Sequence, residues 1–319
     1  MSFYSRVLMA FALASVVCLV STNLHNRREH RSESVSIELA LLHRQPLVYD
    51  GEKSDLPAFR NRILVPLLME ASNKMIPGSS QEHFLAWRLV SAWVMFLVLF
   101  FALKESSWEK MMLGGTLLSL VCILSFGHPW EHASDFPDVA FQIGFALVTV
   151  RYRFSLLVLL ACLAVFNRES AVFAGLIWVF VHGWDHGPKY REVLRGVLLS
   201  IGVYALVYLV RSWFAFTTGP QLQVLGFLYM GKVIRVFLAD PHPYSWAHQL
   251  VAAIIFVAGV VSHYSRSLDK VSRRLIYAAC TLFFISLVFG MLDEIRVFLP
   301  VFAIAIYAGL RMPTADYES

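Results

Sequence analysis

The hydrophobic positions of this chain gather into long, nearly uninterrupted runs. Six runs have about the 20 mostly apolar residues that a transmembrane helix needs: Tyr4–Thr22, Phe84–Leu103, Met111–Gly127, Val193–Phe216, Ala247–Tyr264 and Ile276–Leu292. Four runs are shorter: Phe136–Val150, Phe154–Phe166, Ala171–His182 and Val297–Leu310. The shorter runs cross a membrane only if flanking residues extend them or neighbouring helices cover them. The pattern predicts an all-α, polytopic integral membrane protein with about ten transmembrane helices.

The first apolar run follows Arg6 and resembles a signal peptide. Its exit reads Ser21-Thr22-Asn23-Leu24, which has no small-x-small cleavage pattern. We therefore interpret this run as an uncleaved first span.

The positions of lysine and arginine test the number of spans, because short loops rich in these residues stay in the cytoplasm. With ten spans and a cytoplasmic N-terminus, every inner loop is basic: Arg6; Lys104 and Lys110; Arg151 and Arg153; Lys189, Arg191 and Arg195; Arg266, Lys270, Arg273 and Arg274; Arg311. The short outer loops receive only Arg168, Lys232, Arg235 and Arg296. We expect both termini to be cytoplasmic, and residues 1–319 to form a single transmembrane domain with no separate soluble domain.

The composition agrees with a membrane protein. The chain is 58% hydrophobic and 15% charged, whereas a soluble domain carries roughly 25% charged residues. This excludes a soluble enzyme, a disordered protein and a small disulfide scaffold. The sequence pI of about 9.0 comes from lysine and arginine in the inner loops and gives no reason to expect a nucleic-acid partner. We expect a multi-pass protein of a bacterial inner membrane.

Two predicted outer loops are long, covering residues 23–83 and 217–246. The first contains two amphipathic stretches, Val35–His43 and Ile63–Ile76, and the second contains the apolar stretch Val224–Ala239, which is interrupted by two basic residues. Helices of this kind often lie flat on a membrane or cap a cavity beneath it. The sequence therefore predicts amphipathic helices in the first outer loop.

Charged residues also adjoin the predicted spans on the outer face: Asp138, Arg168, Glu169, Asp293, Glu294 and Arg296. Ionisable groups at the hydrocarbon boundary are costly, and they usually pair, line a polar cavity or take part in chemistry. The structural alternative is a set of ion pairs that lock short helices together. Several separate segments place charged residues on the outer face, and this favours a functional site over structural ion pairs.

One outer loop carries a possible metal site. His128 and His132 are four residues apart, near Glu131 and Asp135, so a helix would align the two histidines. The pattern is not HExxH, and capping or hydrogen bonding explains such residues equally well. We expect no cofactor and no metal ion, and His128 and His132 stay the candidates if a divalent metal is used.

These residues, in this order, resemble the GT-C glycosyltransferases, which are multi-span enzymes that use polyprenyl-phosphate sugars as donors. The resemblance is carried by Asp50, Phe59–Leu68, Asp138, Asn167–Ser170 and Glu294–Pro300. It covers most of the chain as scattered short motifs. It implies a membrane enzyme that moves a sugar from a polyprenyl-phosphate donor to an acceptor at the outer face.

The resemblance also implies roles for individual residues. An acidic residue of the first outer loop is the catalytic base in this family, which corresponds here to Asp50, with Asp55 as the substitute. Such a carboxylate removes the proton of the acceptor hydroxyl as that oxygen attacks the sugar. Guanidinium groups stabilise the departing lipid phosphate, and the candidates are Arg60, Arg62, Arg168 and Arg296. Glu169 and Glu294 are expected to orient these arginines, and Asp138 to bind sugar hydroxyls.

Two other functions stay open at this point. A transporter or lipid flippase places its charges near the bilayer midplane at broken helices, and the short runs on either side of Arg168 and Glu169 have that character. A membrane assembly subunit without chemistry of its own would tolerate loss of the outer carboxylates one at a time.

Overall fold

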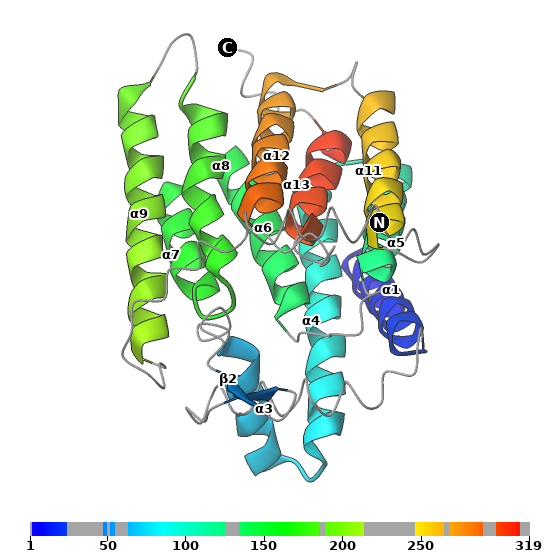
Figure 1. Ribbon diagram of the computed structural model, residues 1–319. Helices are drawn as coiled ribbons and strands as arrows, with labels where there is room; N and C mark the ends of the chain where they lie inside the picture. Colours follow the sequence, from blue (N-terminus) through cyan, green and yellow to red (C-terminus); the bar gives the residue numbers. More distant parts are fainter. Residues whose placement is uncertain are drawn as a thin grey trace, which may run out of the picture.

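Each of the ten apolar runs forms a helix in the computed structural model (Figure 1). The structure describes residues 2–23, 47–49, 52–54, 63–125, 134–184, 189–213, 246–264, 268–289 and 298–312. The helices are α1 (Phe3–Asn23), α4 (Ser80–Ala102), α5 (Trp108–Ser125), α6 (Asp135–Val150), α7 (Phe154–Ala164), α8 (Phe173–His182), α9 (Tyr190–Trp213), α11 (Trp246–His263), α12 (Lys270–Phe289) and α13 (Leu299–Leu310). The 3-10 helix η2 (Glu169–Val172) precedes α8, and the first predicted loop adds α3 (Leu64–Met75).

The prediction of a helical protein with helices that could cross a membrane is confirmed. Among the described residues, four helices are long and apolar enough to cross a membrane: Phe3–Ser21, Ser80–Ala102, Trp108–Ser125 and Tyr190–Val210. The shorter apolar helices include Phe154–Ala164, Glu169–His182, Val251–His263 and Leu299–Leu310. A small antiparallel pair, β1 (Leu47–Tyr49) with β2 (Glu52–Ser54), lies in the first predicted loop.

Helix α4 begins where local sequence chemistry predicts. The backbone N–H of Glu82 donates to Ser79 Oγ (3.3 Å), and the backbone N–H of Ser79 donates to Glu82 Oε2 (2.7 Å). This capping box satisfies two backbone donors at the helix start. From there α4 continues for 23 residues, or about 34 Å.

Helix α13 is the centre of the core. All of its residues except the partly buried Ala305 are buried, and it packs against α12, α5, α6 and α11. Pro300 lies in its first turn, where the missing proline N–H removes no helix hydrogen bond. A helix that is apolar on every side is stable only when neighbours surround it, and Figure 1 shows α13 among them.

Helices α8 and α9 approach each other closely through small residues. A Cβ added to Gly175 would collide with the backbone carbonyl oxygen of Gly196 and with Ser200, and a Cβ on Gly196 would meet Val179. Gly196 and Ser200 are four residues apart on α9 and match the small-xxx-small pattern of tightly packed membrane helices. The close approach therefore depends on these small side chains.

The predicted amphipathic stretch Ile63–Ile76 forms α3. This helix buries Val65 and Met69 against Phe84 at the start of α4, and Trp87 Nε1 donates to Ser72 Oγ (3.0 Å). Leu67 and Met75 are exposed. The other two stretches, Val35–His43 and Val224–Ala239, lie outside the described residues.

Candidate functional site

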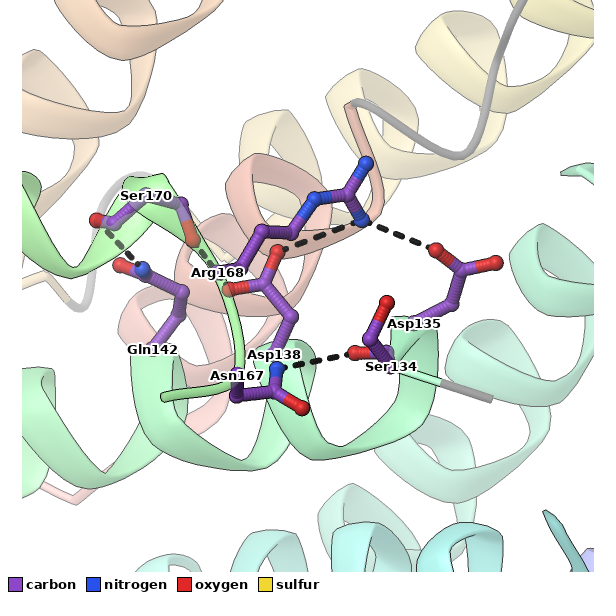
Figure 2. A network of polar contacts seen from close by, with 7 residues as sticks. All are labelled: Ser134, Asp135, Asp138, Gln142, Asn167, Arg168 and Ser170. Carbon is purple, nitrogen blue, oxygen red and sulfur yellow. Dashed lines mark hydrogen bonds and ion pairs between the residues drawn. The ribbon is translucent and has the colours of Figure 1, made fainter. Parts of the chain in front are cut away.

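Seven residues of α6 and of the turn between α7 and η2 form a network that we call the buried polar layer (Figure 2). Its members are Ser134, Asp135, Asp138, Gln142, Asn167, Arg168 and Ser170. Asp135, Asp138 and Gln142 follow the i, i+3, i+7 spacing, which places them along one face of α6. Asn167 and Arg168 come from the turn opposite, and Ser170 is the second residue of η2.

Arg168 holds two carboxylates. Its Nη1 donates to Asp135 Oδ1 at 2.9 Å and lies 3.6 Å from Asp138 Oδ2. The three side chains are 6%, 0% and 4% exposed, in the order Arg168, Asp135, Asp138. Burying ionised groups is unfavourable unless each is paired and hydrogen bonded. The ion pairs therefore explain how these charges lie inside the helix bundle.

Hydrogen bonds fix the turn against α6. Asn167 Nδ2 donates to the backbone carbonyl of Ser134 (3.0 Å), and Gln142 Nε2 donates to the backbone carbonyl of Ser170 (3.0 Å). The Ser170 hydroxyl donates to Asp138. Contacts from three points of the turn to one face of α6 give the layer a defined geometry.

Three uncharged side chains of the layer each have an oxygen without a hydrogen-bond partner among the described residues. These oxygens are Ser134 Oγ, Gln142 Oε1 and Asn167 Oδ1, and their residues are at most 1% exposed. A buried polar atom without a partner is unfavourable by about 1–3 kcal/mol, and most such atoms in native proteins find one. The layer thus retains hydrogen-bond acceptors that a bound donor can use.

The buried polar layer lies part-way along the long helices. Ser200 Oγ donates to the backbone carbonyl of Val172 (3.0 Å), which places the end of η2 about 15 Å from the Tyr190 end of α9. Along α6, Asp138 and Asp135 lie about 18 and 22 Å from the Val150 end. Helix α9 extends about 35 Å in total, so the layer lies between its two ends. Asp135 and Asp138 nevertheless lie in the first turn of their own helix, α6.

Arg88 is a second buried guanidinium beside the layer. This residue of α4 is 1% exposed, donates from Nη2 to Ser21 Oγ (3.0 Å), and has its Cζ 5.6 Å from the ring centroid of Phe136. Phe136 directly follows Asp135. Arg88 lies inside the apolar run Phe84–Leu103, and an arginine in such a run is itself a sign of a buried polar contact.

The structure describes three of the site residues predicted from sequence. Asp138 and Arg168 belong to the buried polar layer, and Glu169 is the half-buried first residue of η2. The others lie outside the described residues: Asp50, Asp55, Arg60, Arg62, Glu294, Arg296 and the possible metal ligands His128 and His132. The backbone N–H groups of Ile63 and Leu64 both donate to the Phe166 carbonyl (2.9 and 2.8 Å), so the described chain after Arg62 begins beside the α7–η2 turn.

Sequence reasoning missed the role of Asp135, which it considered only with the nearby histidines. The structure pairs this carboxylate with Arg168. The available signal was the spacing of Asp135 and Asp138, because two carboxylates three residues apart share one helix face. Within the described part of the chain, no group of three His, Cys, Asp or Glu side chains is arranged to hold a metal ion.

A second polar cluster, around the buried carboxylate of Glu192, lies near the opposite end of α6, and we call it the Glu192 group. The Glu192 carboxylate accepts hydrogen bonds from Tyr152 Oη (2.9 Å), Trp178 Nε1 (3.1 Å) and Arg195 Nη1 (2.8 Å). Burial and the Glu192 hydrogen bond raise the pKa of the Tyr152 phenol, which keeps it a donor at neutral pH. These contacts tie the α6–α7 turn to α8 and α9.

Comparisons of the chain with protein families, curated proteins and solved structures find no match. Two features of the site bear on function. They are a layer of paired charges inside the helix bundle and the backbone connection of this layer to α3.

Proposed function

We propose that this protein is a membrane glycosyltransferase that moves a sugar from a polyprenyl-phosphate donor to an acceptor at the outer face of the membrane. The observation that carries the proposal is the buried polar layer, in which Asp135, Asp138 and Arg168 lie together inside a bundle of apolar helices. Ionisable groups at such depth are rarely retained without a function. The backbone link from Phe166 to α3 connects this layer to the loop that carries Asp50 and Asp55.

The proposed chemistry divides the residues into three tasks. Asp50, or Asp55 in its place, removes the proton of the acceptor hydroxyl as the acceptor oxygen bonds to the sugar C1 and the C1–O bond to the phosphate breaks. Guanidinium groups stabilise the negative charge that the departing lipid phosphate keeps; these are assigned to Arg60, Arg62 and Arg296, with Glu294 orienting them. Asp138, Arg168 and Glu169 belong to the donor-binding region.

The proposed topology has ten spans, with both termini in the cytoplasm of a bacterial cell and the multi-pass domain in its inner membrane. Support comes from the helices formed by all ten apolar runs and from the basic residues of the predicted inner loops. Membrane lipids cover the shorter helices and present the lipid-linked donor. No nucleic acid takes part.

The decisive experiment measures transfer of radiolabelled sugar from polyprenyl phosphate by purified protein in lipid nanodiscs. We expect Asp50→Asn or Asp55→Asn to lower the rate by about 10²- to 10⁴-fold, the usual contribution of a general base. Glu105→Gln is the control, because Glu105 is an exposed carboxylate between α4 and α5. Wild-type rates in both aspartate variants would contradict the assignment of the base. Absence of transfer from every sugar donor by the wild type would contradict the proposed reaction.

One observation favours a transporter or lipid flippase as the second candidate. The buried polar layer lies part-way along α9, at a turn between two short helices, and transporters build their sites at such interruptions. Movement of a fluorescent lipid-linked sugar across proteoliposomes, without chemical transfer of the sugar, would favour this second function.

A further inference from the structure

We propose that the buried polar layer binds the ring hydroxyls of the donor sugar. Ser134, Gln142 and Asn167 accept hydrogen bonds from these hydroxyls. Arg168 is a positioning residue and not a phosphate ligand. The reference to a donor sugar rests on the proposed function. The inference adds the chemical class that this layer recognises, and it changes the role expected for Arg168 from the sequence.

Two amide oxygens and one hydroxyl of the layer remain able to accept hydrogen bonds. The amide nitrogens of Asn167 and Gln142 already donate to backbone carbonyls (both 3.0 Å), whereas their oxygens have no partner among the described residues. The Ser134 hydroxyl likewise has none within the described chain. Figure 2 shows that hydroxyl between the Asp135 and Asp138 side chains. The amide oxygens of Asn167 and Gln142 only accept, so a ligand that satisfies them has to donate hydrogen bonds, whereas the Ser134 hydroxyl can accept or donate.

The charges in the layer select against a phosphate. Arg168 Nη1 lies 2.9 Å from Asp135 and 3.6 Å from Asp138, so the guanidinium is already held by two carboxylates. A phosphate placed here would face both carboxylates in a low-dielectric environment, where like charges repel strongly. Sugar hydroxyls are neutral and donate readily to carboxylate, amide and hydroxyl oxygens.

Arg168 then acts through its neighbours. Its side chain is 6% exposed and joins two carboxylates one helical turn apart on α6, as Figure 2 shows. By fixing the Asp135 and Asp138 side chains on one face of α6, it sets the spacing of the acceptors around Ser134. Its removal disturbs sugar recognition without removing a phosphate contact.

The test uses wild-type protein in lipid nanodiscs and the methyl glycosides of glucose, galactose and mannose as probes, with binding measured by saturation-transfer NMR. We expect at least one methyl glycoside to bind and inorganic phosphate not to displace it. Asn167→Leu and Gln142→Leu should each weaken binding about tenfold or more, as expected when one buried hydrogen bond is lost. Thr149→Val is the matched control: its buried hydroxyl also lacks a partner among the described residues, but it lies at the other end of α6.

The role of Arg168 is tested by two further variants. Arg168→Gln should weaken methyl glycoside binding, and Arg168→Lys should restore part of it, because lysine keeps the charge that holds the carboxylates. Inhibition of transfer by sugar-free polyprenyl phosphate should stay unchanged in Arg168→Lys, since the phosphate is bound elsewhere. A strong loss of that inhibition alone, with normal glycoside binding, would assign Arg168 to the phosphate and overturn the inference.

Three other outcomes overturn the inference: no binding of any methyl glycoside by the wild type, displacement of the glycoside by inorganic phosphate, or wild-type glycoside affinity in both leucine variants. The last outcome would mean that the unpartnered oxygens hold only water. A different result would contradict the proposed function and leave the sugar site intact. If the wild type transfers no sugar but binds glycosides in a way that Asn167→Leu abolishes, the sugar site stands and the glycosyltransferase proposal fails.

Discussion

The buried polar layer and the Glu192 group, which lie near opposite ends of α6, distribute their hydrogen bonds in opposite ways. In the Glu192 group, a single carboxylate accepts from three donors that come from the α6–α7 turn, α8 and α9. In the buried polar layer, one guanidinium pairs with two carboxylates, and three uncharged side chains beside them each have an oxygen without a partner among the described residues. One cluster is rich in donors, and the other retains acceptors.

We interpret this difference as that between a structural cluster and the proposed binding site. A closed network of buried hydrogen bonds fixes helices relative to one another, whereas partly satisfied networks are unfavourable unless a bound group completes them. Thr149 Oγ1, near the Glu192 group, also lacks a partner among the described residues, but it is a single hydroxyl on the opposite end of the helix. Four substitutions test the comparison, from the largest expected effect to the smallest.

Arg168→Leu should have the largest effect on stability. The change leaves Asp135 and Asp138 buried without the guanidinium that pairs them, and breaking a buried ion pair costs about 3–5 kcal/mol. Thermal unfolding in detergent, followed by intrinsic fluorescence, measures the loss. Adding Asp135→Leu to this variant should recover part of the stability. An unchanged melting temperature for Arg168→Leu would show that the layer is held by other contacts.

Glu192→Gln should destabilise the protein by roughly 2–3 kcal/mol. The amide that replaces one carboxylate oxygen is a donor, so it faces the donors of Tyr152, Trp178 or Arg195 and leaves a buried group unpaired. Sugar transfer per folded molecule should stay at the wild-type rate, because the Glu192 group is structural. A stable variant with lost activity would reverse the assignment of roles to the two clusters.

Gly175→Ala tests the contact between α8 and α9, which lies between the two clusters. The new methyl group meets the backbone carbonyl oxygen of Gly196, and overpacking of this kind costs about 1–3 kcal/mol. Gly202→Ala on α9 is the control, because an added Cβ there meets nothing within 4 Å. Equal melting temperatures for the two variants would argue against a tight α8–α9 contact.

Thr149→Val should have the smallest effect on the free energy of unfolding, within roughly 0.5 kcal/mol in either direction. The substitution removes a buried hydroxyl that has no partner in the described chain, and it keeps the shape of the side chain. Melting temperature and methyl glycoside binding should both match the wild type. A marked loss of glycoside binding would mean that the two ends of α6 are coupled.

The sequence predicted the helices well because the length and apolarity of a run are local properties. The amphipathic pattern of residues 63–76 predicted α3. Asp138 and Arg168 were predicted as site residues because charged residues are rare next to a transmembrane span. The sequence did not predict that Asp135 pairs with Arg168 or that Arg88 lies over Phe136. Such pairs join residues tens of positions apart, and they depend on which helices lie side by side.

The start of α3 has a consequence for the order in which the protein is built. This helix has no side-chain cap, and the N–H groups of Ile63 and Leu64 instead donate to the carbonyl of Phe166. Helices usually satisfy these first donors with a nearby serine, threonine, aspartate or asparagine. During synthesis, which proceeds from the N-terminus, residue 166 emerges long after residues 63 and 64. A helix encoded early in the chain therefore receives its cap late, once the hairpin that carries Arg168 has been made.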